Sequence, residues 1–465
     1  MLWLAFHFHS LSLEVFSRGA AVPEPLAVVE KQGGRTWVIA HNDAAAACGV
    51  CTGMAAPAAQ ALADGLVVRK RDLSAEQESL AGLAVWAGRF TPSVSLEPPA
   101  GLLLEIGTCL SLHRGLANLL KLARSGINEM GYAATMACAP TSHGAWLLAQ
   151  ANVEKAVRDP ARLETILAAL PVTLLDQPPA VLEGLDRVGA RTIGDCLRLP
   201  RGGVARRFGQ SLLDELDLAL GRLPEARAFF VPPASFERSL ELPAPVGDAE
   251  AVQVAAHRLL PELEGFLTLR QAGVQELELV CRHERRESTV LKLGFAKPTR
   301  DASRMQLLLR DTLGRTRLEA PVHTIVLRAP RVLPLSGSNS DLFQKSREAD
   351  GDLLLERLRI RLGKDAVYGI ETAADHRPER GWRVCEAPAG AAANRHRPLW
   401  LLPRPLPCHD GRLKLTSGPE RIESGWWDGA DVARDYYVAE DRNGAQLWVY
   451  CDRVSGEWYV HGVFA

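Results

Sequence analysis

Positively charged side chains gather in one stretch of the sequence, between residues 282 and 331. This stretch holds twelve Lys or Arg and five Asp or Glu, a local charge of +7, whereas the whole chain carries −1. Such a stripe suits contact with nucleic-acid phosphates and does not read bases. We therefore predict a DNA-binding surface here, with a solvated charged face as the alternative. The candidate residues are Arg282, Arg285, Arg286, Lys292, Lys297, Arg300 and Arg304.

A second candidate for phosphate binding is the segment LEGLDRVGARTIGDCL, residues 182–197. It resembles half of a helix-hairpin-helix unit, in which the turn at Gly189 would present backbone N–H groups at a helix N-terminus. Basic and acidic residues balance at eight each over 171–232, so ordinary solvated helix charges are the alternative. The nearby candidate side chains are Arg187, Arg191, Arg206 and Arg207.

Side chains suited to metal or redox chemistry are few. His7 and His9 alternate with aromatic residues and are interpreted as packed strand residues. Cys48 and Cys51 form a single CxxC without a second pair at zinc spacing, which argues against zinc. Glu97 and the nearby Glu105 are typical of ordinary hairpin carboxylates. We expect no bound metal and no cofactor.

Several short strands and helices must position these candidates. Alternating patterns predict strands near residues 2–9, 26–30 and 35–40, followed by TPSVSLE, GLLLEIG and YAATMACAP, with amphipathic helices between them. This order predicts an α+β sheet with helices on one side. Short helices follow over 171–228, and from Phe236 the pattern reads helix–strand–strand–helix–strand. SGSNSD (336–341) has the composition of a linker.

The composition bounds the function. The chain has 465 residues, 47% hydrophobic and 23% charged, so we expect a folded protein of about three domains. Lys and Arg number 54 and Asp and Glu 55, which excludes a globally basic protein. No apolar run reaches the roughly 18 to 20 residues that span a bilayer, and the N-terminus lacks the pattern of a signal peptide. Nine scattered cysteines favour the reducing cytoplasm.

Ordered motifs resemble a known family over essentially the whole chain. The chain is similar to the UmuC/DinB-like Y-family DNA polymerases, and within them to the ImuB family, the polymerase-like subunits of the bacterial SOS mutasome. The resemblance implies an α+β, multidomain right hand with palm, fingers, thumb and little finger, plus an aromatic-rich C-terminal extension. The motifs are GVCTGM (49–54), LPRGGVARRFG (199–209), DHRPE (375–379), RPLWLL (397–402), GPERIESGWWDG (418–429), RDYYVA (434–439), LWVY (447–450) and WYVHGVFA (458–465).

The resemblance also implies domain boundaries. We expect a palm and fingers over 1–170, a helical thumb over 171–232 and a DNA-binding little finger over 235–335. A linker over 336–350 and a partner-binding C-terminal region over 351–465 would follow.

The polymerase site implied by the family is degenerate in this chain. Y-family enzymes hold two metal ions on palm carboxylates. The first ligand ends the N-terminal strand, which places it at His9, with the next acidic place at Leu11. The later acidic pair falls on Glu97 and Pro98, which leaves a single carboxylate.

The nucleotide-binding positions are also altered. The Tyr and Arg that contact the triphosphate in active relatives fall here at Asp43 and Ala46. A carboxylate in place of a cation repels a triphosphate at close range. We therefore predict no catalytic residues.

Family members commonly carry a short clamp-binding motif after the little finger. Here the linker offers Asn339, Asp341, Leu342 and Phe343, in which Asn replaces the usual Gln. The two apolar residues could fill a pocket of the sliding clamp, and an ordinary linker is the alternative.

The C-terminal region is dense in aromatic residues, which can form a small β core or anchor an interface. The resemblance implies that this region recruits the RecA-like ImuA, RecA and an error-prone C-family DNA polymerase. Candidate partner-binding residues are Trp426, Trp427, Arg434, Asp435, Tyr436, Trp458 and Phe464.

Together with the altered metal and nucleotide positions, the resemblance implies a cytoplasmic, catalytically inactive scaffold that gathers on the nucleoid after DNA damage. It would link the clamp, primer-template DNA and a separate polymerase in translesion synthesis and DNA repair. One alternative is an active low-fidelity polymerase, which primer extension would reveal. Another is a DNA-binding repair accessory without clamp contact, which a clamp pull-down would identify.

Overall fold

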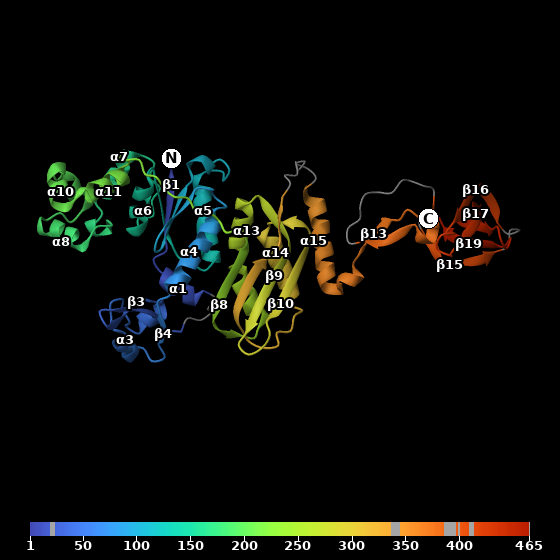
Figure 1. Ribbon diagram of the computed structural model, residues 1–465, viewed down its shortest axis with the longest axis horizontal. Helices are drawn as coiled ribbons and strands as arrows, with labels where there is room; N and C mark the ends of the chain where they lie inside the picture. Colours follow the sequence, from blue (N-terminus) through green and yellow to red (C-terminus); the bar gives the residue numbers. More distant parts are fainter. Residues whose placement is uncertain (19–23, 336–344, 386–396, 399, 409–412, 465) are drawn as a thin grey trace. The chain divides into compact units, whose positions relative to one another are not determined.

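The computed structural model describes residues 1–18, 24–335, 345–385, 397–398, 400–408 and 413–464. The chain forms two compact units, Met1–Ile360 and Arg361–Ala465. Figure 1 follows the chain through both units from blue to red. Among the described residues, no helix combines the length and the apolar character that crossing a bilayer requires.

The first unit begins with an antiparallel four-stranded sheet in the order β5-β6-β1-β7, here called the palm-like sheet. Alternation along β1 sends Leu4 and Phe6 to one face and Ala5 to the other, where they join separate hydrophobic cores. The strands are β1 (Trp3–His7), β5 (Val94–Glu97), β6 (Gly101–Glu105) and β7 (Thr135–Ala139).

Helices cover both faces of the palm-like sheet. On one face lie α1 (Leu11–Ser17), α4 (Leu73–Ala87) and α5 (Leu116–Glu129), and on the other lies α6 (Ser142–Gln150). The expectation of helices on one side is therefore wrong. Most residues of α6 are buried, because the helix lies between the sheet and the following helical module.

A small fingers-like module contains the sheet β3-β2-β4 and two short helices around an Ala- and Val-rich core. Its hairpin turns at Gly33 and Gly34, both at positive φ, which glycine adopts without strain. The elements are β2 (Leu26–Gln32), β3 (Arg35–His41), α2 (Asp43–Ala47), α3 (Ala56–Leu62) and β4 (Val67–Lys70).

The thumb-like module consists of short helices, as the sequence predicted. Its apolar residues continue the core that α6 forms with the palm-like sheet, so the module is fixed to that face. The helices are α7 (Pro160–Ala168), α8 (Pro179–Arg187), α9 (Ile193–Arg198), α10 (Arg201–Phe208) and α11 (Gln210–Leu220).

The little-finger-like module is a sheet in the order β10-β9-β11-β8, with β12 paired to β9, and three helices that share its largest core. The predicted order began with a helix and missed β8, which forms the edge of the sheet. The elements are β8 (Phe236–Val246), α12 (Ala249–His257), α13 (Leu260–Leu269), β9 (Ala272–His283), β10 (Thr289–Thr299), α14 (Ala302–Leu313), β11 (Val322–Ala329) and β12 (Val332–Pro334).

Helix α13 of the little-finger-like module packs directly against α4 of the palm-like module (Figure 1). A Cβ on Gly265 would lie 2.5 Å from the carbonyl oxygen of Val85, so the close approach requires glycine at this place. The carboxylate of buried Glu262 forms ion pairs with the guanidinium groups of Arg18 and Arg238, at N···O distances of 3.5 and 3.1 Å. Glycine-mediated packing and buried charge thus fix the two modules together.

Helix α15 (Lys345–Leu362) begins inside the segment expected as a linker and packs on the little-finger-like module. Leu353 and Ile360 contact its core. Glu356, with a side chain 1% exposed, accepts the backbone N–H of Ala296 at 2.6 Å and accepts hydrogen bonds from Nε and Nη2 of Arg304 with its two carboxylate oxygens.

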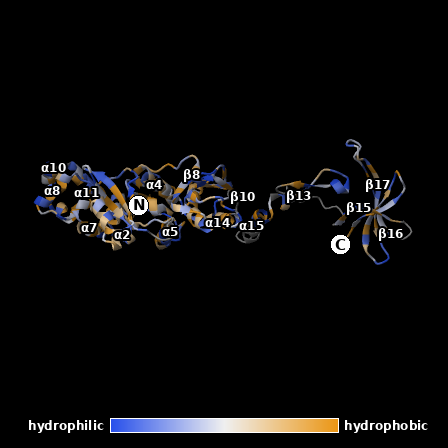
Figure 2. Ribbon diagram, turned by 90° about the horizontal axis from the view of Figure 1, so that it is seen from below, coloured by the Kyte–Doolittle hydropathy of each residue, from blue (hydrophilic) through white to orange (hydrophobic). Residues whose placement is uncertain are grey.

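The second unit contains a two-stranded ribbon, β13 (Gly369–Thr372) with β14 (Trp382–Cys385), and an antiparallel sheet in the order β15-β19-β18-β17-β16. Hydrophilic residues gather in the loops of this sheet (Figure 2). Its core is aromatic, with Tyr436, Trp448 and Tyr450. The predicted α+β, multidomain class with an aromatic-rich extension is confirmed. The strands are β15 (Trp400–Cys408), β16 (Lys414–Ser424), β17 (Val432–Glu440), β18 (Gln446–Asp452) and β19 (Trp458–Val463).

Candidate functional site

The end of the palm-like sheet brings one residue from each strand into a single row. Glu97 of β5 pairs with Gly101 of β6, which pairs in turn with His7 of β1. His7 also pairs with Thr135 of β7. Paired residues point to the same face of a sheet, here the face on which α6 lies. The row therefore holds one carboxylate and one imidazole.

Trp146 of α6 covers the middle of this row. A Cβ on Gly101 would lie 2.5 Å from the Trp146 ring, so a side chain here would displace it. The ring centroids of Trp146 and His7 are 5.4 Å apart. Burial, and then the neighbouring His9, lower the pKa of His7, which is therefore neutral at pH 7. Beyond Trp146, the Glu97 end of the row opens into a cleft of about 560 Å³.

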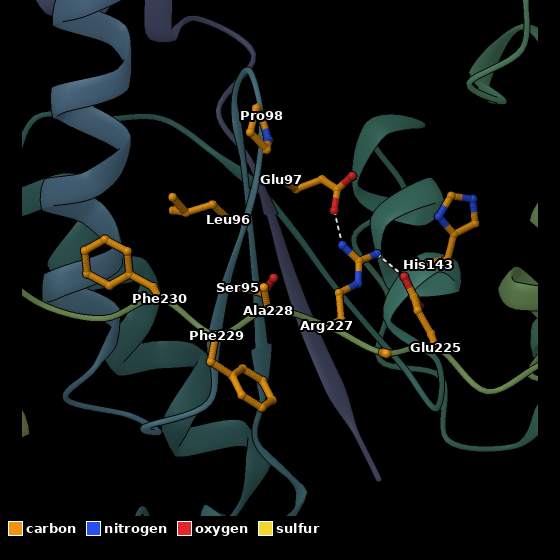
Figure 3. Close-up of a pocket in the computed structure, with 11 residues that line it drawn as sticks. Ser95, Leu96, Glu97, Pro98, His143, Glu225, Arg227, Ala228, Phe229 and Phe230 are labelled. Atoms are coloured by element: carbon orange, nitrogen blue, oxygen red, sulfur yellow. Dashed lines mark hydrogen bonds and ion pairs between the residues drawn. The ribbon is translucent and has the colours of Figure 1, made fainter.

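An arginine from a distant part of the chain lies in this cleft. Figure 3 shows the Arg227 guanidinium between the carboxylates of Glu97 and Glu225, with an ion pair to each. The Arg227 side chain is 13% exposed. Glu225 also accepts the hydroxyl of Ser142 at the start of α6. Two carboxylates thus share one guanidinium at the place where the family resemblance puts metal ions.

His143 lines the same cleft and connects it to the thumb-like module. Its Nε2 lies 3.3 Å from Oε1 of Glu215 on α11. Burial acts to raise the pKa of Glu215, but the contact with His143 and the hydrogen bonds from Gln177 and the backbone of Asp176 outweigh it and lower that pKa. Glu215 is therefore ionised at neutral pH and is already bound within the thumb-like module.

The structure corrects the position of the first predicted ligand. Strand β1 ends at His7, so the residue at the strand end is His7 and not His9. His9 is exposed in the following turn. Leu11 is buried at the start of α1, and Pro98 lies in the turn between β5 and β6. Of the four palm positions, only Glu97 both lies at the cleft and carries a carboxylate.

The two predicted nucleotide positions lie on α2 of the fingers-like module. Asp43 and Ala46 are both exposed there, and Asn42 caps the helix by accepting the N–H of Ala45 at 2.9 Å. Neither residue offers a cation to a phosphate.

The residues at the cleft do not fit a pair of magnesium ions. Mg²⁺ requires near-octahedral oxygen ligands, and imidazole suits other metals better. Both carboxylates at the cleft already bind Arg227. Among the described residues, no three Asp, Glu, His or Cys side chains are grouped as metal ligands.

Sequence reasoning missed Arg227 and Glu225 as members of this site. They lie about 130 residues from Glu97, in a segment without a motif, and the eight basic and eight acidic residues of 171–232 leave no net charge that would mark them. The one available signal was the alternation Glu225-Ala226-Arg227 directly after the thumb helices.

The turn at Gly189 differs from the predicted phosphate site. The amides of Gly189 and Ala190 donate to carbonyls of α8 at 2.9 and 3.0 Å. The amides of Arg191 and Thr192 donate to Oδ2 of Asp195 at 3.0 and 2.8 Å. The prediction of exposed donors is therefore wrong, because a capping box satisfies them within the chain.

The thumb arginines are nevertheless accessible. Arg187 and Arg191 form exposed ion pairs with Glu183 and Asp186. Arg206 and Arg207 are exposed near the end of α10. Such surface pairs are weak and can exchange for a phosphate.

The predicted basic stripe divides into three groups in the structure. Arg282, Arg285, Arg286 and Arg300 are exposed, at or near the β9–β10 turn and before α14. Lys292 and Lys297 are exposed but paired, the first with Glu276 and Glu278 and the second with Asp352. Arg304 is largely buried and bound to Glu356, so its assignment to DNA is wrong.

The sheet face opposite the helices of this module is not strongly basic. The strand registers place three basic and four acidic side chains on it, several of them in ion pairs. The local charge of +7 is therefore distributed over turns and helices. The residues on this face are Arg282, Lys292, Arg328, Glu237, Glu241, Glu276 and Glu278.

The candidate clamp motif, Asn339, Asp341, Leu342 and Phe343, lies outside the described residues. It falls between β12 and α15.

The predicted partner-binding residues separate into core and surface. Tyr436 is 1% exposed and hydrogen-bonds His461 Nδ1 at 2.7 Å, so its assignment to a partner surface is wrong. Arg434 lies over the ring of Tyr450, Asp435 binds Arg421, and Phe464 packs on the core. Trp458 is half-buried against Tyr437.

Trp426 and Trp427 form the exposed part of this set, at 78% and 58%. They meet edge to face, with ring centroids 5.5 Å apart, in the loop between β16 and β17. Beneath Trp427 lies Arg377, whose side chain is 3% exposed and binds both Asp375 and Asp428. Hydrogen bonds from Arg377 lower the pKa of each of these carboxyl groups to about 2.

Comparison with known proteins agrees with the motifs. Residues 16–150 match the model of the impB/mucB/samB family. Protein ImuB from two strains of Caulobacter vibrioides, NA1000/CB15N and ATCC 19089/CIP 103742/CB 15, is 29% identical over 456 residues. Each match covers 90% of this chain and 100% of the relative.

Solved polymerase structures match more weakly. DinB from Sulfolobus solfataricus and an insertion ternary complex of Dbh DNA polymerase are 16% and 15% identical, with TM-scores of 0.40 and 0.42. Each covers 72% of this chain and 100% of the other. The resemblance read from the motifs is confirmed by the family match and the relatives: residues 16–150 match the impB/mucB/samB family model, and the chain is similar to ImuB over nine-tenths of its length.

Proposed function

We propose that this chain is a polymerase-like scaffold without nucleotidyl transfer activity. It holds primer-template DNA and the sliding clamp near an error-prone C-family polymerase during SOS translesion synthesis. The observation that carries the proposal is the end of the palm-like sheet. Its row contains one carboxylate, Glu97, and that carboxylate binds Arg227.

Primer extension with the purified chain tests this proposal. We expect no product above background with Mg²⁺ or Mn²⁺, because nucleotidyl transfer requires metal ions held by several carboxylate oxygens. A Glu97→Ala variant is the matched control for trace activity from a contaminating polymerase. Extension that is reproducible with the parent and lost in Glu97→Ala or His7→Ala would overturn the proposal.

DNA binding in this proposal is electrostatic and independent of sequence. The exposed arginines of the β9–β10 turn, Arg282, Arg285 and Arg286, support it together with Arg206 and Arg207 of the thumb-like module. Within the described residues, Arg285 has no carboxylate partner, and Arg286 has only an exposed one, Glu319, at 3.6 Å. Guanidinium groups in this state can bind phosphates with little competition from the protein.

Clamp binding is assigned to Leu342 and Phe343. Burial of a Leu or Phe side chain contributes roughly 1.5–3 kcal/mol, so replacing both with Ala should abolish a micromolar interaction. Asn339→Gln should strengthen binding, because a longer amide extends further toward hydrogen-bond partners. Pull-down or calorimetry with the purified clamp measures both effects. If the double Ala variant binds the clamp as well as the parent does, another segment makes the clamp contact.

Protein partners are assigned to the exposed pair Trp426 and Trp427. Interface hot spots are enriched in Trp, and a rigid loop loses little entropy on docking. Arg377 and Asp428 hold this loop in place from below. Partners of the kind expected for the family are ImuA, RecA and the C-family polymerase. Replacing both Trp residues with Ala should weaken at least one of these complexes in a pairwise binding assay while DNA binding remains.

A further inference from the structure

The segment between the thumb-like helices and β8 is attached to the palm-like module at three points. Phe230 donates its N–H to the carbonyl of Val94 on the edge strand β5 at 2.7 Å, and its ring packs against the cores of both the palm-like and little-finger-like modules. Glu225 binds Ser142 on α6. Between these two anchors, Arg227 reaches Glu97 at the end of β5.

The guanidinium of Arg227 matches the two carboxylates of the cleft in charge. It uses one terminal nitrogen for Glu97 and the other for Glu225 (Figure 3). The three side chains are 13%, 25% and 19% exposed, so water screens these contacts only in part. A planar guanidinium that is always charged can donate along two edges, which a lysine ammonium cannot reproduce.

A dissolved divalent cation competes poorly for the same carboxylates. Mg²⁺ gives up its hydration shell reluctantly and needs octahedral ligation. Arg227 is tethered through Glu225 and Phe230, so its effective concentration at Glu97 is high. Removing Arg227 would leave two carboxylates close together without a counter-ion, an arrangement that attracts a metal ion or a proton.

We propose that Arg227 is a built-in cation that replaces a divalent metal in the palm cleft and fastens the thumb-to-little-finger segment, residues 225–231, across the end of the palm-like sheet. The protein itself therefore neutralises the remaining carboxylates of the degenerate site, and these carboxylates hold the segment in place. Arg227 would occupy the cation position and hold residues 225–231 whether or not the chain extends primers.

Manganese binding to the full-length chain tests the first half of the proposal. Electron paramagnetic resonance of Mn²⁺ at pH 7 and low salt would compare the parent with Arg227→Met, which keeps an unbranched side chain and removes the guanidinium and its charge. We expect Arg227→Met to gain one site that binds Mn²⁺ at least tenfold more tightly than any site of the parent. Adding Glu97→Gln should abolish the gain.

Arg222→Met is the matched control. Arg222 lies five residues away and pairs with Glu164 and Asp217 in the thumb-like module, with a side chain 45% exposed. Its removal should create no comparable site. Equal Mn²⁺ binding by the parent and Arg227→Met, or an equal gain in Arg222→Met, would overturn the proposal.

Hydrogen exchange tests the second half. The amides of 225–231 should exchange at least tenfold faster in Arg227→Met than in the parent or in Arg222→Met. If Arg227→Met does not fold, Glu97→Gln in the parent should still raise exchange in this segment, because it removes one of the two charged contacts. Unchanged exchange in a folded variant would show that Arg227 does not hold this segment. If the chain extends primers but Arg227→Met still gains the Mn²⁺ site, the proposed function is wrong and the role of Arg227 stands.

Discussion

Two arginines, Arg227 in the first unit and Arg377 in the second, each bind two carboxylates, and the consequences differ. Arg227 lines a cleft between β5 and α6 and pairs with the two carboxylates there. Arg377 lies beneath a loop and supports two exposed indoles, Trp426 and Trp427. An arginine with two carboxylates therefore lines a cleft in the first unit and supports an exposed loop in the second. The surroundings of a charged cluster, rather than its composition, decide its role.

The largest expected effect is a difference in stability between two Trp→Ala variants of the second unit, one in its core and one on the surface that Arg377 supports. Trp448→Ala should cost about 3–5 kcal/mol in the free energy of unfolding, because Trp448 is 2% exposed and stacks on Tyr436 at 4.2 Å. Trp426→Ala should change it by less than about 0.5 kcal/mol. Denaturant titration of the full chain, followed by hydrogen exchange in β17 and β18, measures both. A large loss of unfolding free energy in Trp426→Ala would show that the exposed Trp pair stabilises the fold.

A carboxylate without an arginine clamp provides the contrasting case. Burial raises the pKa of Glu14 to about 7, although the N–H of Ala133 and the charge of Arg18 act in the other direction. The folded state then binds more protons than the unfolded state between pH 4.5 and 7, so Glu14 reduces stability as the pH rises through this range.

Glu14→Gln should remove this penalty. The variant should be more stable than the parent by about 2–3 kcal/mol at pH 8 and nearly equal to it at pH 4.5. Thermal unfolding of both proteins across this range measures the difference. A difference that does not depend on pH would mean that Glu14 is ionised without cost.

The Arg377 cluster should respond to acid in the opposite sense. The folded-state pKa of Asp375 and Asp428 is about 2, below the ordinary value of 3.8. Their contribution to stability is therefore complete above about pH 4 and lost as the pH falls through 2. Fluorine NMR of fluorotryptophan-labelled protein should show an unchanged Trp427 signal down to about pH 3, assigned with Trp427→Phe. Loss of that signal near pH 5, or an unchanged signal in Arg377→Ala, would show that the cluster does not hold the loop.

The smallest effect compares arginines that are already bound with arginines that are accessible. Replacing Arg285 and Arg286 with Ala should reduce the slope of log affinity for DNA against log salt by about 0.9 for each lost phosphate contact. Lys292→Ala should leave the slope unchanged, because Lys292 already binds Glu276 and Glu278. Fluorescence anisotropy with a primer-template at several salt concentrations measures the slopes. Equal slopes in all variants would place DNA binding in the thumb-like module.

Much of the organisation follows from the sequence alone. Alternation over MLWLAFHFHS predicted a strand because each face of β1 joins its own apolar core. The motif series in the C-terminal region predicted a resemblance to ImuB, and the relatives that are 29% identical over 90% of the chain confirm that resemblance. That Leu11 and Pro98 cannot bind a metal ion is also a fact of sequence, since neither side chain carries a carboxylate.

The tertiary structure decided which charges are available. Arg304 and Arg285 look alike in the basic stripe, yet α15 binds the first through Glu356 and leaves the second in a turn. Tyr436 and Trp426 look alike in the aromatic region, yet one lies in a core and the other in a loop. Local pattern cannot make these distinctions, because each depends on a residue far away in the sequence. Arg227 lies 130 residues from Glu97, and only folding brings its charge to the palm cleft.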